Sequence, residues 1–359
     1  MMLADNGAEV IRIDRAGGLG AGVPIDDTRD VMLRSRRTIS LDLKSPVGLD
    51  VARRLCSGAD GLIEGFRPGV MERLGLGPDV LLGANPGLAY GRMTGWGQDG
   101  PYAQRAGHDI NYLAVNGVLD AISRRGDVPL PPLNLLGDYA GGGLLLAFGM
   151  IAVILAVRQG GRGRVVDCAM TEGAGALMAG IWSLRANDLW DRPPGENLLD
   201  GGAPFYAAYR TADGRHAAVG AIETRFYVRL CEKLGLADDP DFADQHDYAR
   251  WPTMRQKLTV RFANQTLAEF EALFADEDVC FAPVVAMAQA PANPHNRERS
   301  AYIEIDGIVQ PAPVPRFAGC ERPTQAMWRE NNDRVVLLGE LGFDAEGIEA
   351  LNRDGAFGH

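Results

Sequence analysis

The stretch TISLDLKSPVGLDVARRLCSGADGLIE, residues 38–64, sets the fold class. It begins with the strand-like run Thr38–Leu43, continues through the helical pattern Val47–Cys56 and ends with the strand-like run Gly61–Glu64. The same order continues outward, with strand-like runs at Ala8–Asp14, Leu88–Thr94 and Arg164–Met170 and a helical pattern over Glu172–Leu189. Strands that alternate with helices predict an α/β fold with a mostly parallel, doubly wound sheet.

A change of composition predicts a second domain. Residues 191–204, DRPPGENLLDGGAP, are rich in proline and glycine and are typical of a linker. Beyond them a hairpin pattern and amphipathic helical patterns indicate a smaller α+β domain. We therefore predict a large domain that starts with 1–190, a linker at 191–204, a small domain at 205–292, and a return to the large domain through 293–359.

Composition restricts the possible functions. The chain has 359 residues, 46% of them hydrophobic and 23% charged, with a net charge of −11, which argues against a broad nucleic-acid surface. Its five cysteines are scattered without metal-ligand spacing, which predicts no metal site and a reducing compartment. The N-terminal residues lack the pattern of a signal peptide, so we expect a cytoplasmic protein.

One uncharged stretch, Tyr139–Val157, is nearly long enough to span a bilayer. It follows a polar segment and starts with three glycines, Gly141–Gly143. A single apolar stretch in an otherwise soluble pattern is typical of a buried helix. We therefore expect a core helix and no membrane partner.

Three residues are candidates for acid–base chemistry. His108 follows a glycine- and tryptophan-rich loop, where an imidazole is well placed to transfer protons, although a structural histidine fits the same pattern. Asp138 precedes the apolar helix at the position of an N-cap, whose backbone N–H groups would also attract an enolate oxygen. Glu223 ends a strand in the small domain, where an orienting role and a surface role are both open.

Basic residues follow several predicted strands. Arg15, Lys44 and Arg67 each come just after a strand, and the carboxyl ends of parallel strands form one edge of a sheet. Guanidinium and ammonium groups at that edge suit a ligand with several phosphates. The sequence has no GxxxxGK[ST] motif, and the GxGxxG pattern at 95–100 (GWGQDG) lies in a loop with no helical pattern directly after it, so an ordinary dinucleotide or nucleoside triphosphate site is poorly supported.

Six longer motifs follow one another along the chain, namely MLRSRRTISLDLK (32–44), IEGFRPGVMERLGLG (63–77), YGRMTGWGQDGP (90–101), GHDINY (107–112), PLNLLGDYAGGG (132–143) and LDGGAPFY (199–206). Together they closely resemble the alpha-methylacyl-CoA racemases of the family III CoA-transferase superfamily. The resemblance is weakest at the C-terminus. EGFRPG and the GWG loop mark the superfamily, and GHDINY with NLLGDYAGG marks the racemase branch.

The resemblance implies roles for particular residues. It makes His108 and Asp138 the two catalytic groups and Glu223 the support of the histidine. The positions that match coenzyme A contacts of the family are Arg15, Arg34, Leu41, Asp42, Leu43, Lys44, Gly65, Phe66, Arg67, Arg73, Gly107, Asp109, Ile110, Asn111 and Tyr112.

The resemblance also implies an architecture. It predicts a Rossmann-like large domain, a small domain and an interlocked homodimer, with the active site between one chain's large domain and the other's small domain. Family members usually begin further upstream, with a strand and a glycine-rich turn that lie inside the sheet, so this chain departs from the pattern there.

The implied activity is the interconversion of (2R)- and (2S)-2-methylacyl-CoA through an enolate, without a separate cofactor because coenzyme A is part of the substrate. One alternative is a CoA-transferase of the same superfamily, in which Asp138 would be the nucleophile. The other is an inactive acyl-CoA binding protein. The presence of His108 favours the racemase, because the transferase chemistry needs no histidine opposite the aspartate.

Overall fold

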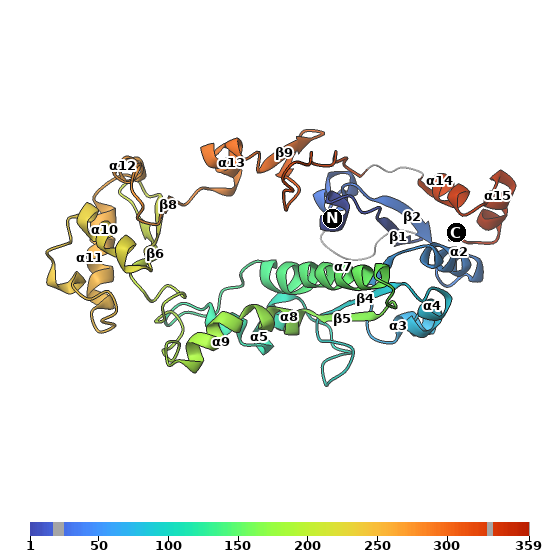
Figure 1. Ribbon diagram of the computed structural model, residues 1–359, viewed down its shortest axis with the longest axis horizontal. Coiled ribbons are helices and arrows are strands. Elements are labelled where there is room, and N and C mark those ends of the chain that lie inside the picture. Colours follow the sequence, from blue (N-terminus) through green and yellow to red (C-terminus); the bar gives the residue numbers. More distant parts are fainter. Residues whose placement is uncertain (17–24, 329–332, 359) are drawn as a thin grey trace. The chain divides into compact units, whose positions relative to one another are not determined.

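The computed structural model describes residues 1–16, 25–328 and 333–358 (Figure 1). Within it the chain forms two compact units. Unit 1 contains Met1–Ala106, Asp138–Gly173 and Pro291–His359, and unit 2 contains Gly107–Gly137 and Ala174–Ala290. The small domain expected at 205–292 falls in unit 2 up to residue 290, and the expected domain limits stay predictions.

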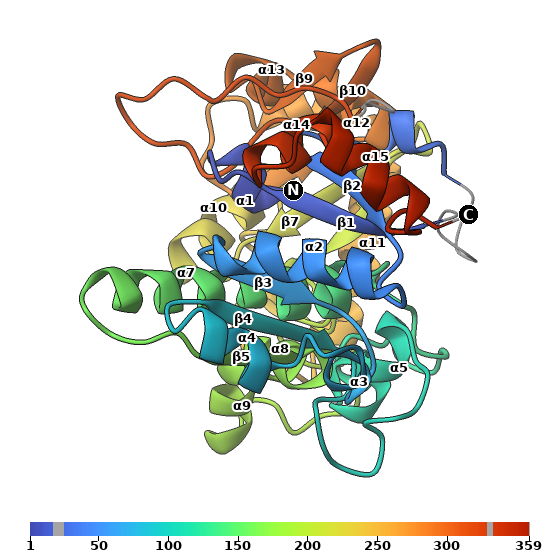
Figure 2. The same ribbon diagram turned by 90° about the vertical axis from the view of Figure 1, so that its right-hand side faces the viewer.

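Parallel strands form the centre of unit 1. They are β1 (Ile11–Arg15), β2 (Arg37–Leu41), β3 (Gly61–Glu64), β4 (Ala89–Thr94) and β5 (Val165–Ala169). β1 pairs with β2, and β3, β4 and β5 pair in that order, all in parallel, and Figure 2 shows both sets. The predicted α/β class with parallel strands is confirmed, although the strands form two sheets and not one.

One apolar core joins the two parallel sheets. Ile39 and Leu41 of β2 and Tyr90 of β4 belong to the same buried cluster, together with Val51 of α2. The helical elements of unit 1 outside the 135–158 region are α1 (Met2–Asp5), η1 (Asp27–Arg29), η2 (Val31–Leu33), α2 (Pro46–Ser57), α3 (Val70–Leu74), α4 (Pro78–Ala84), α13 (Pro294–Glu298), α14 (Asp333–Glu340) and α15 (Ala345–Arg353). The predicted helix Val47–Cys56 is therefore present as α2.

The uncharged stretch forms a helical segment, the π-helix η3 (Leu135–Leu144) followed by α7 (Leu145–Arg158). In the described part of the chain, Leu135–Arg158 is the one helix whose length and composition would allow it to cross a membrane. Leu146 and Met150 are buried, and α7 packs along β4 and β5 (Figure 1). Only 22% of its most apolar window is buried within this chain. The expectation of a buried core helix is wrong for the single chain, because the sheet covers only one face of α7.

A buried ion pair connects the two ends of unit 1. The side chains of Arg34 and Asp5 are 1% and 2% exposed, and two hydrogen bonds of 2.9 and 2.5 Å join them. The other branch of the guanidinium donates to Gln310 Oε1 and to the Pro311 carbonyl, at 2.7 and 2.8 Å. Both acceptors lie in β10 (Ile308–Pro311), which pairs antiparallel with β9 (Tyr302–Ile305). Arg34 therefore holds α1 against a hairpin near the C-terminus.

Unit 2 contains an antiparallel sheet in the order β6 (Tyr206–Arg210), β7 (His216–Gly220) and β8 (Phe281–Pro283). Its aromatic core includes Phe205, Trp251 and Phe262. The helical elements that lie wholly in unit 2 are α5 (Asp109–Val115), α6 (Val118–Ala121), α9 (Ala179–Ala186), α10 (Thr224–Leu234), η4 (Pro240–Phe242), α11 (Trp251–Ala263) and α12 (Leu267–Leu273). Three further elements, η3, α8 (Met170–Leu177) and η5 (Met287–Ala292), cross a limit between the units.

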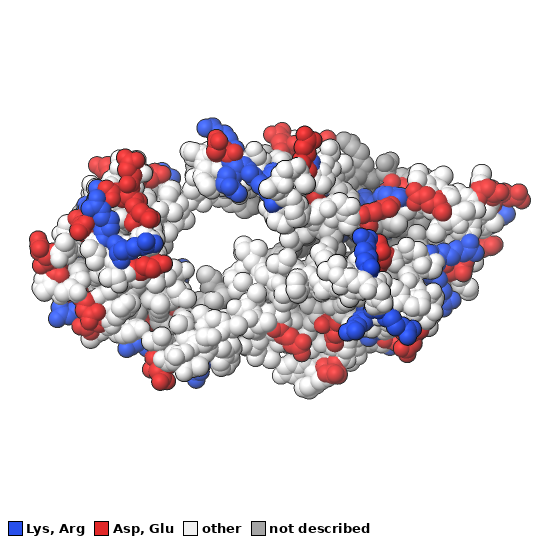
Figure 3. All heavy atoms as spheres, in the orientation of Figure 1, with Lys and Arg blue, Asp and Glu red and all other residues white. Residues whose placement is uncertain are grey.

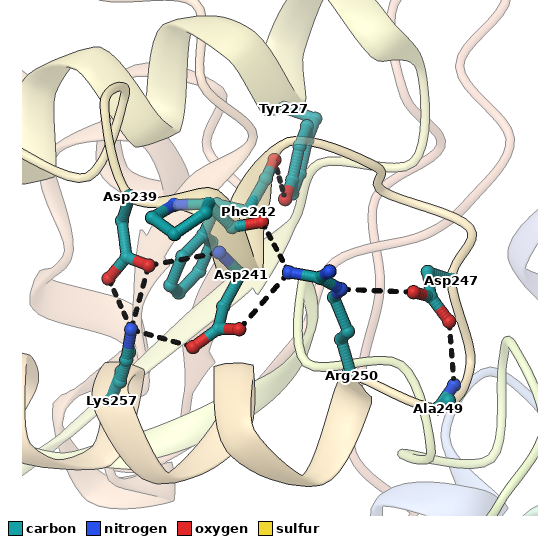
Figure 4. A network of polar contacts seen from close by, with 9 residues as sticks. Tyr227, Asp239, Asp241, Phe242, Asp247, Ala249, Arg250 and Lys257 are labelled. Carbon is teal, nitrogen blue, oxygen red and sulfur yellow. Dashed lines mark hydrogen bonds and ion pairs between the residues drawn. The ribbon is translucent and has the colours of Figure 1, made fainter.

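Ion pairs fix the loop that precedes α11 (Figure 4). The ammonium group of Lys257, on α11, contacts the carboxylates of Asp239 and Asp241 at 2.5 and 2.8 Å. The guanidinium of Arg250, the residue just before α11, pairs with Asp241 and Asp247 at 3.2 and 3.1 Å. The loop is thus held by positive charges on the helix that follows it and at the start of that helix.

We predict that Asp5→Ala lowers the free energy of unfolding by about 3–5 kcal/mol, because it leaves the buried Arg34 guanidinium without its counter-charge. Urea denaturation measures the change. Asp50→Ala is the matched control, since it removes an exposed ion pair with Arg54 and should cost about 0.5 kcal/mol or less. Equal losses in the two variants would contradict the structural role given to Asp5.

A second prediction concerns pH. Hydrogen bonds from Arg229 and Lys233 lower the pKa of Glu277 to about 2, from 4.5. These ion pairs should therefore stabilise the fold fully above pH 4.5, and the contribution should be lost as the pH falls toward 2. We expect the difference in unfolding free energy between wild type and Glu277→Gln to shrink on acidification. A difference that does not change between about pH 7 and about pH 3 would refute this.

Candidate active site

His108 lies at the start of helix α5, in extended backbone with φ −131° and ψ 174°, and its side chain is exposed. Its backbone N–H donates to Asn111 Oδ1 at 3.0 Å. The Tyr112 hydroxyl donates to the carbonyl of Gly107. These local hydrogen bonds fix the backbone of the GHDINY motif and leave the imidazole open to solvent.

The side chain of Asp109, the next residue, lies in a different environment from that of His108. Its side chain is buried, and Oδ2 accepts a hydrogen bond of 2.8 Å from the backbone N–H of Gly137. Gly137 directly precedes Asp138 in the chain. The GHDINY and NLLGDYAGG motifs are therefore joined by a hydrogen bond that neither motif reveals by itself.

Asp138 lies within the π-helix η3 and is half-buried. The expectation of an N-cap position is wrong, because the helical turns already begin at Leu135. The residue that faces the glycine run on α8 must itself be glycine, since a Cβ at Gly173 would lie only 1.8 Å from the carbonyl oxygen of Gly141. The backbones around Gly141 and Gly173 therefore approach each other closely. Asp138 itself lies in π-helical turns, which frequently occur at functional sites.

Glu223 precedes α10 at its N-cap position and is exposed. It belongs to unit 2, as does His108, whereas Asp138 belongs to unit 1. That these three residues act together in catalysis stays a prediction.

The predicted coenzyme A contacts of unit 1 begin at the ends of β1 and β2. Arg15 is paired in register with Leu41, so the two strands end at the same edge. Leu41 is buried in the core, whereas Arg15 and Lys44 are exposed. Asp42 accepts a hydrogen bond from the Lys44 backbone N–H at 2.9 Å, and Leu43 packs against the core. The structure thus places a guanidinium and an ammonium group at neighbouring strand ends.

Gly65, Phe66 and Arg67 form an exposed loop after β3, and Arg73 lies on α3, also exposed. A charge cluster that the sequence did not reveal supports this loop. At its centre, Arg92 donates to Gln98 at 2.8 Å and to Glu72.

Glu64 completes that cluster. It lies 3.7 Å from Arg92 and accepts a hydrogen bond of 2.7 Å from the Phe66 N–H. Burial raises the pKa of Glu64 above its usual range. Arg92 and Glu64 therefore link the EGFRPG motif to the GWG loop.

Arg34 differs from the other predicted ligand contacts. All of its side chain is buried, and it is bonded to Asp5, Gln310 and Pro311. A direct contact between Arg34 and a ligand would require this cluster to open, so its part in ligand binding stays a prediction.

Within the described ranges, no group of three or more His, Cys, Asp and Glu side chains is placed to hold a metal ion. Basic side chains occur in several places on the face shown in Figure 3, with acidic side chains among them.

Comparison with known proteins adds a separate line of evidence. Residues 1–331 match the sequence model of CoA-transferase family III. The chain is 44% identical over 358 residues to the alpha-methylacyl-CoA racemase of Mus musculus, which covers 99% of this chain and 91% of that protein. The Homo sapiens racemase is 44% identical over 361 residues, with the same coverage.

A solved structure shows the same fold. The crystal structure of a CAIB/BAIF family protein from Brucella suis matches with a TM-score of 0.79 at 23% identity, covering 95% of this chain and 93% of that one. At this identity the match supports the fold alone. The sequence matches confirm the resemblance inferred from the six motifs.

Proposed function

Because this chain belongs to CoA-transferase family III, we propose that it interconverts the two configurations at C2 of 2-methylacyl-CoA thioesters. The observation that carries this proposal is the 44% identity, over 99% of the chain, to two proteins named alpha-methylacyl-CoA racemase. The motifs GHDINY and NLLGDYAGG, which mark the racemase branch, give further support.

The proposed reaction passes through an enolate. His108 takes the proton from C2, and the electron pair of the broken C–H bond forms the C1–C2 double bond while the thioester oxygen becomes negative. Asp138 then gives a proton to the opposite face of C2, which inverts the centre. The other enantiomer reacts by the same steps in reverse, with Asp138 as the base. No cofactor is consumed.

The remaining site residues would orient the histidine, stabilise the enolate and bind coenzyme A. Glu223 would orient the imidazole of a catalytic histidine. Backbone N–H groups of the turns near Asp138 would stabilise the enolate oxygen. The basic residues at the strand ends, Arg15, Lys44 and Arg67, would bind the phosphates of coenzyme A, since charge-assisted hydrogen bonds suit that ligand.

We further propose that the protein acts as a homodimer in which a second copy covers the open face of α7. Phe148, Ile151 and Leu155 are 70%, 55% and 56% exposed, and their spacing places them on one side of the helix. A contiguous apolar surface of this kind marks an interaction site. The family resemblance, which implies an interlocked dimer, is the reason for choosing a second copy as the partner.

The reaction is tested by deuterium exchange. One enantiomer of a 2-methylacyl-CoA, incubated in D₂O with the protein, should gain deuterium at C2 and lose its optical purity. His108→Ala and Asp138→Ala should each slow inversion by about 10²–10⁴-fold, because each removes one of the two acid–base groups. His295→Ala and Asp79→Ala, which make the same changes at exposed residues of the same types, serve as matched controls.

Two outcomes would contradict the proposed reaction. The first is the absence of deuterium at C2 with intact protein that binds coenzyme A. The second is a covalent coenzyme A adduct on Asp138 formed without exchange at C2, which would indicate a transferase.

The dimer is tested by light scattering on a sizing column. We expect wild type to have the mass of two chains, and the double variant Phe148→Glu/Ile151→Glu to shift toward one, because buried charges at an apolar interface are costly. Val80→Glu, at an exposed apolar residue of α4, is the control. A monomeric wild type would refute the dimer, and binding of that monomer to phospholipid vesicles would assign the face to a membrane instead.

A further inference from the structure

The hydrogen bond between Asp109 and Gly137 closes a long loop of the chain. The two residues are 28 positions apart, and the bond is buried. At one end of the loop Asp109 is peptide-bonded to His108, and at the other end Gly137 is peptide-bonded to Asp138. This single bond therefore connects the immediate neighbours of both proposed acid–base residues.

The fit between these residues is tight. A Cβ added at Gly137 would lie 2.6 Å from Asp109 Oδ2 and 2.9 Å from its Cγ. Such distances are shorter than van der Waals contact, so a larger residue would push the carboxylate away. Gly137 is not among the glycines with positive φ. The close approach of the carboxylate, and not an unusual backbone conformation, is thus what requires glycine at this position.

Apolar packing supports the same junction. Leu113, on the same helix as Asp109, is completely buried in a cluster with Val118 and Leu119. Leu136, the residue before Gly137, packs against this cluster. A hydrogen bond to a buried carboxylate is stronger than one in water, because the surroundings do not screen it. Both ends of the loop are therefore fixed by a polar and an apolar contact together.

We propose that Asp109 is a positioning residue whose carboxylate, by holding the Gly137 N–H, sets the separation of His108 and Asp138. This inference rests on the proposed racemase function. Consecutive Cα atoms are about 3.8 Å apart, so a fixed Asp109–Gly137 contact limits how far the two acid–base residues can separate. Inversion needs both groups at one carbon, whereas exchange of the C2 proton needs only one of them.

The inference gives a specific kinetic signature. Asp109→Ala removes the acceptor, and a misplacement of about 1 Å lowers a rate by about 10²-fold. We expect inversion to fall by about that factor, while KM for the acyl-CoA changes by less than about 3-fold and deuterium exchange with retained configuration falls much less. The ratio of retained to inverted deuterated product should therefore rise. Loss of general stability would lower both reactions together and would not move this ratio.

Two further variants separate positioning from folding. Asp109→Asn keeps an acceptor oxygen and should restore most of the inversion rate. Gly137→Ala leaves Asp109 intact but displaces its carboxylate, and it should reproduce the altered product ratio. If Asp109→Ala fails to fold, the ratio measured for Gly137→Ala decides the question. An unchanged ratio in the variants that fold would overturn the inference.

Hydrogen exchange at the Gly137 amide provides a readout that does not depend on activity. The amide should be protected in wild type and should exchange faster in Asp109→Ala. If wild type shows no reaction but its Gly137 amide is protected through Asp109, the proposed function fails while the contact is real. If wild type is active and the variant has unchanged inversion, the positioning role alone fails.

Discussion

A carboxylate removed from water needs donors around it, and this requirement shapes much of the described structure. Asp5 is bonded to Arg34, which joins the N-terminal helix to a hairpin near the other end of the chain. Glu64 faces Arg92 beneath the loop expected to bind the ligand. Asp109 holds a backbone amide next to Asp138. Segments distant in sequence are thus fixed at a few points by buried acids.

Much of the fold could be predicted because it depends on local periodicity. The strands β2, β3 and β4 and helix α2 follow directly from alternating and helical apolar patterns. The environment of α7 could not be predicted in this way. An apolar helix looks the same in sequence whether its own chain or another surface covers it. Likewise, the predicted helix at 172–189 is divided at Met178, where nearby glycines weaken helical propensity.

The site was partly predictable for a related reason. Motifs identified His108 and Asp138 as chemically suitable residues, but they gave no information about hydrogen bonds across long loops. The Asp109–Gly137 contact and the Arg92 cluster are tertiary features, and they arise only when distant segments meet. The surroundings of Arg34 also could not be predicted. An arginine beside a predicted strand gave no sign that it would be enclosed by a buried acid and a strand from the C-terminal part of the chain.

The π-helix has a consequence for how insertions and deletions would act on this region. In a regular helix each residue turns the chain by about 100°. Removing one glycine from Gly141–Gly143 would rotate the side chains of η3 that precede it by roughly that angle relative to α7. The direction in which Asp138 points is therefore encoded by the length of the glycine run as well as by the aspartate itself.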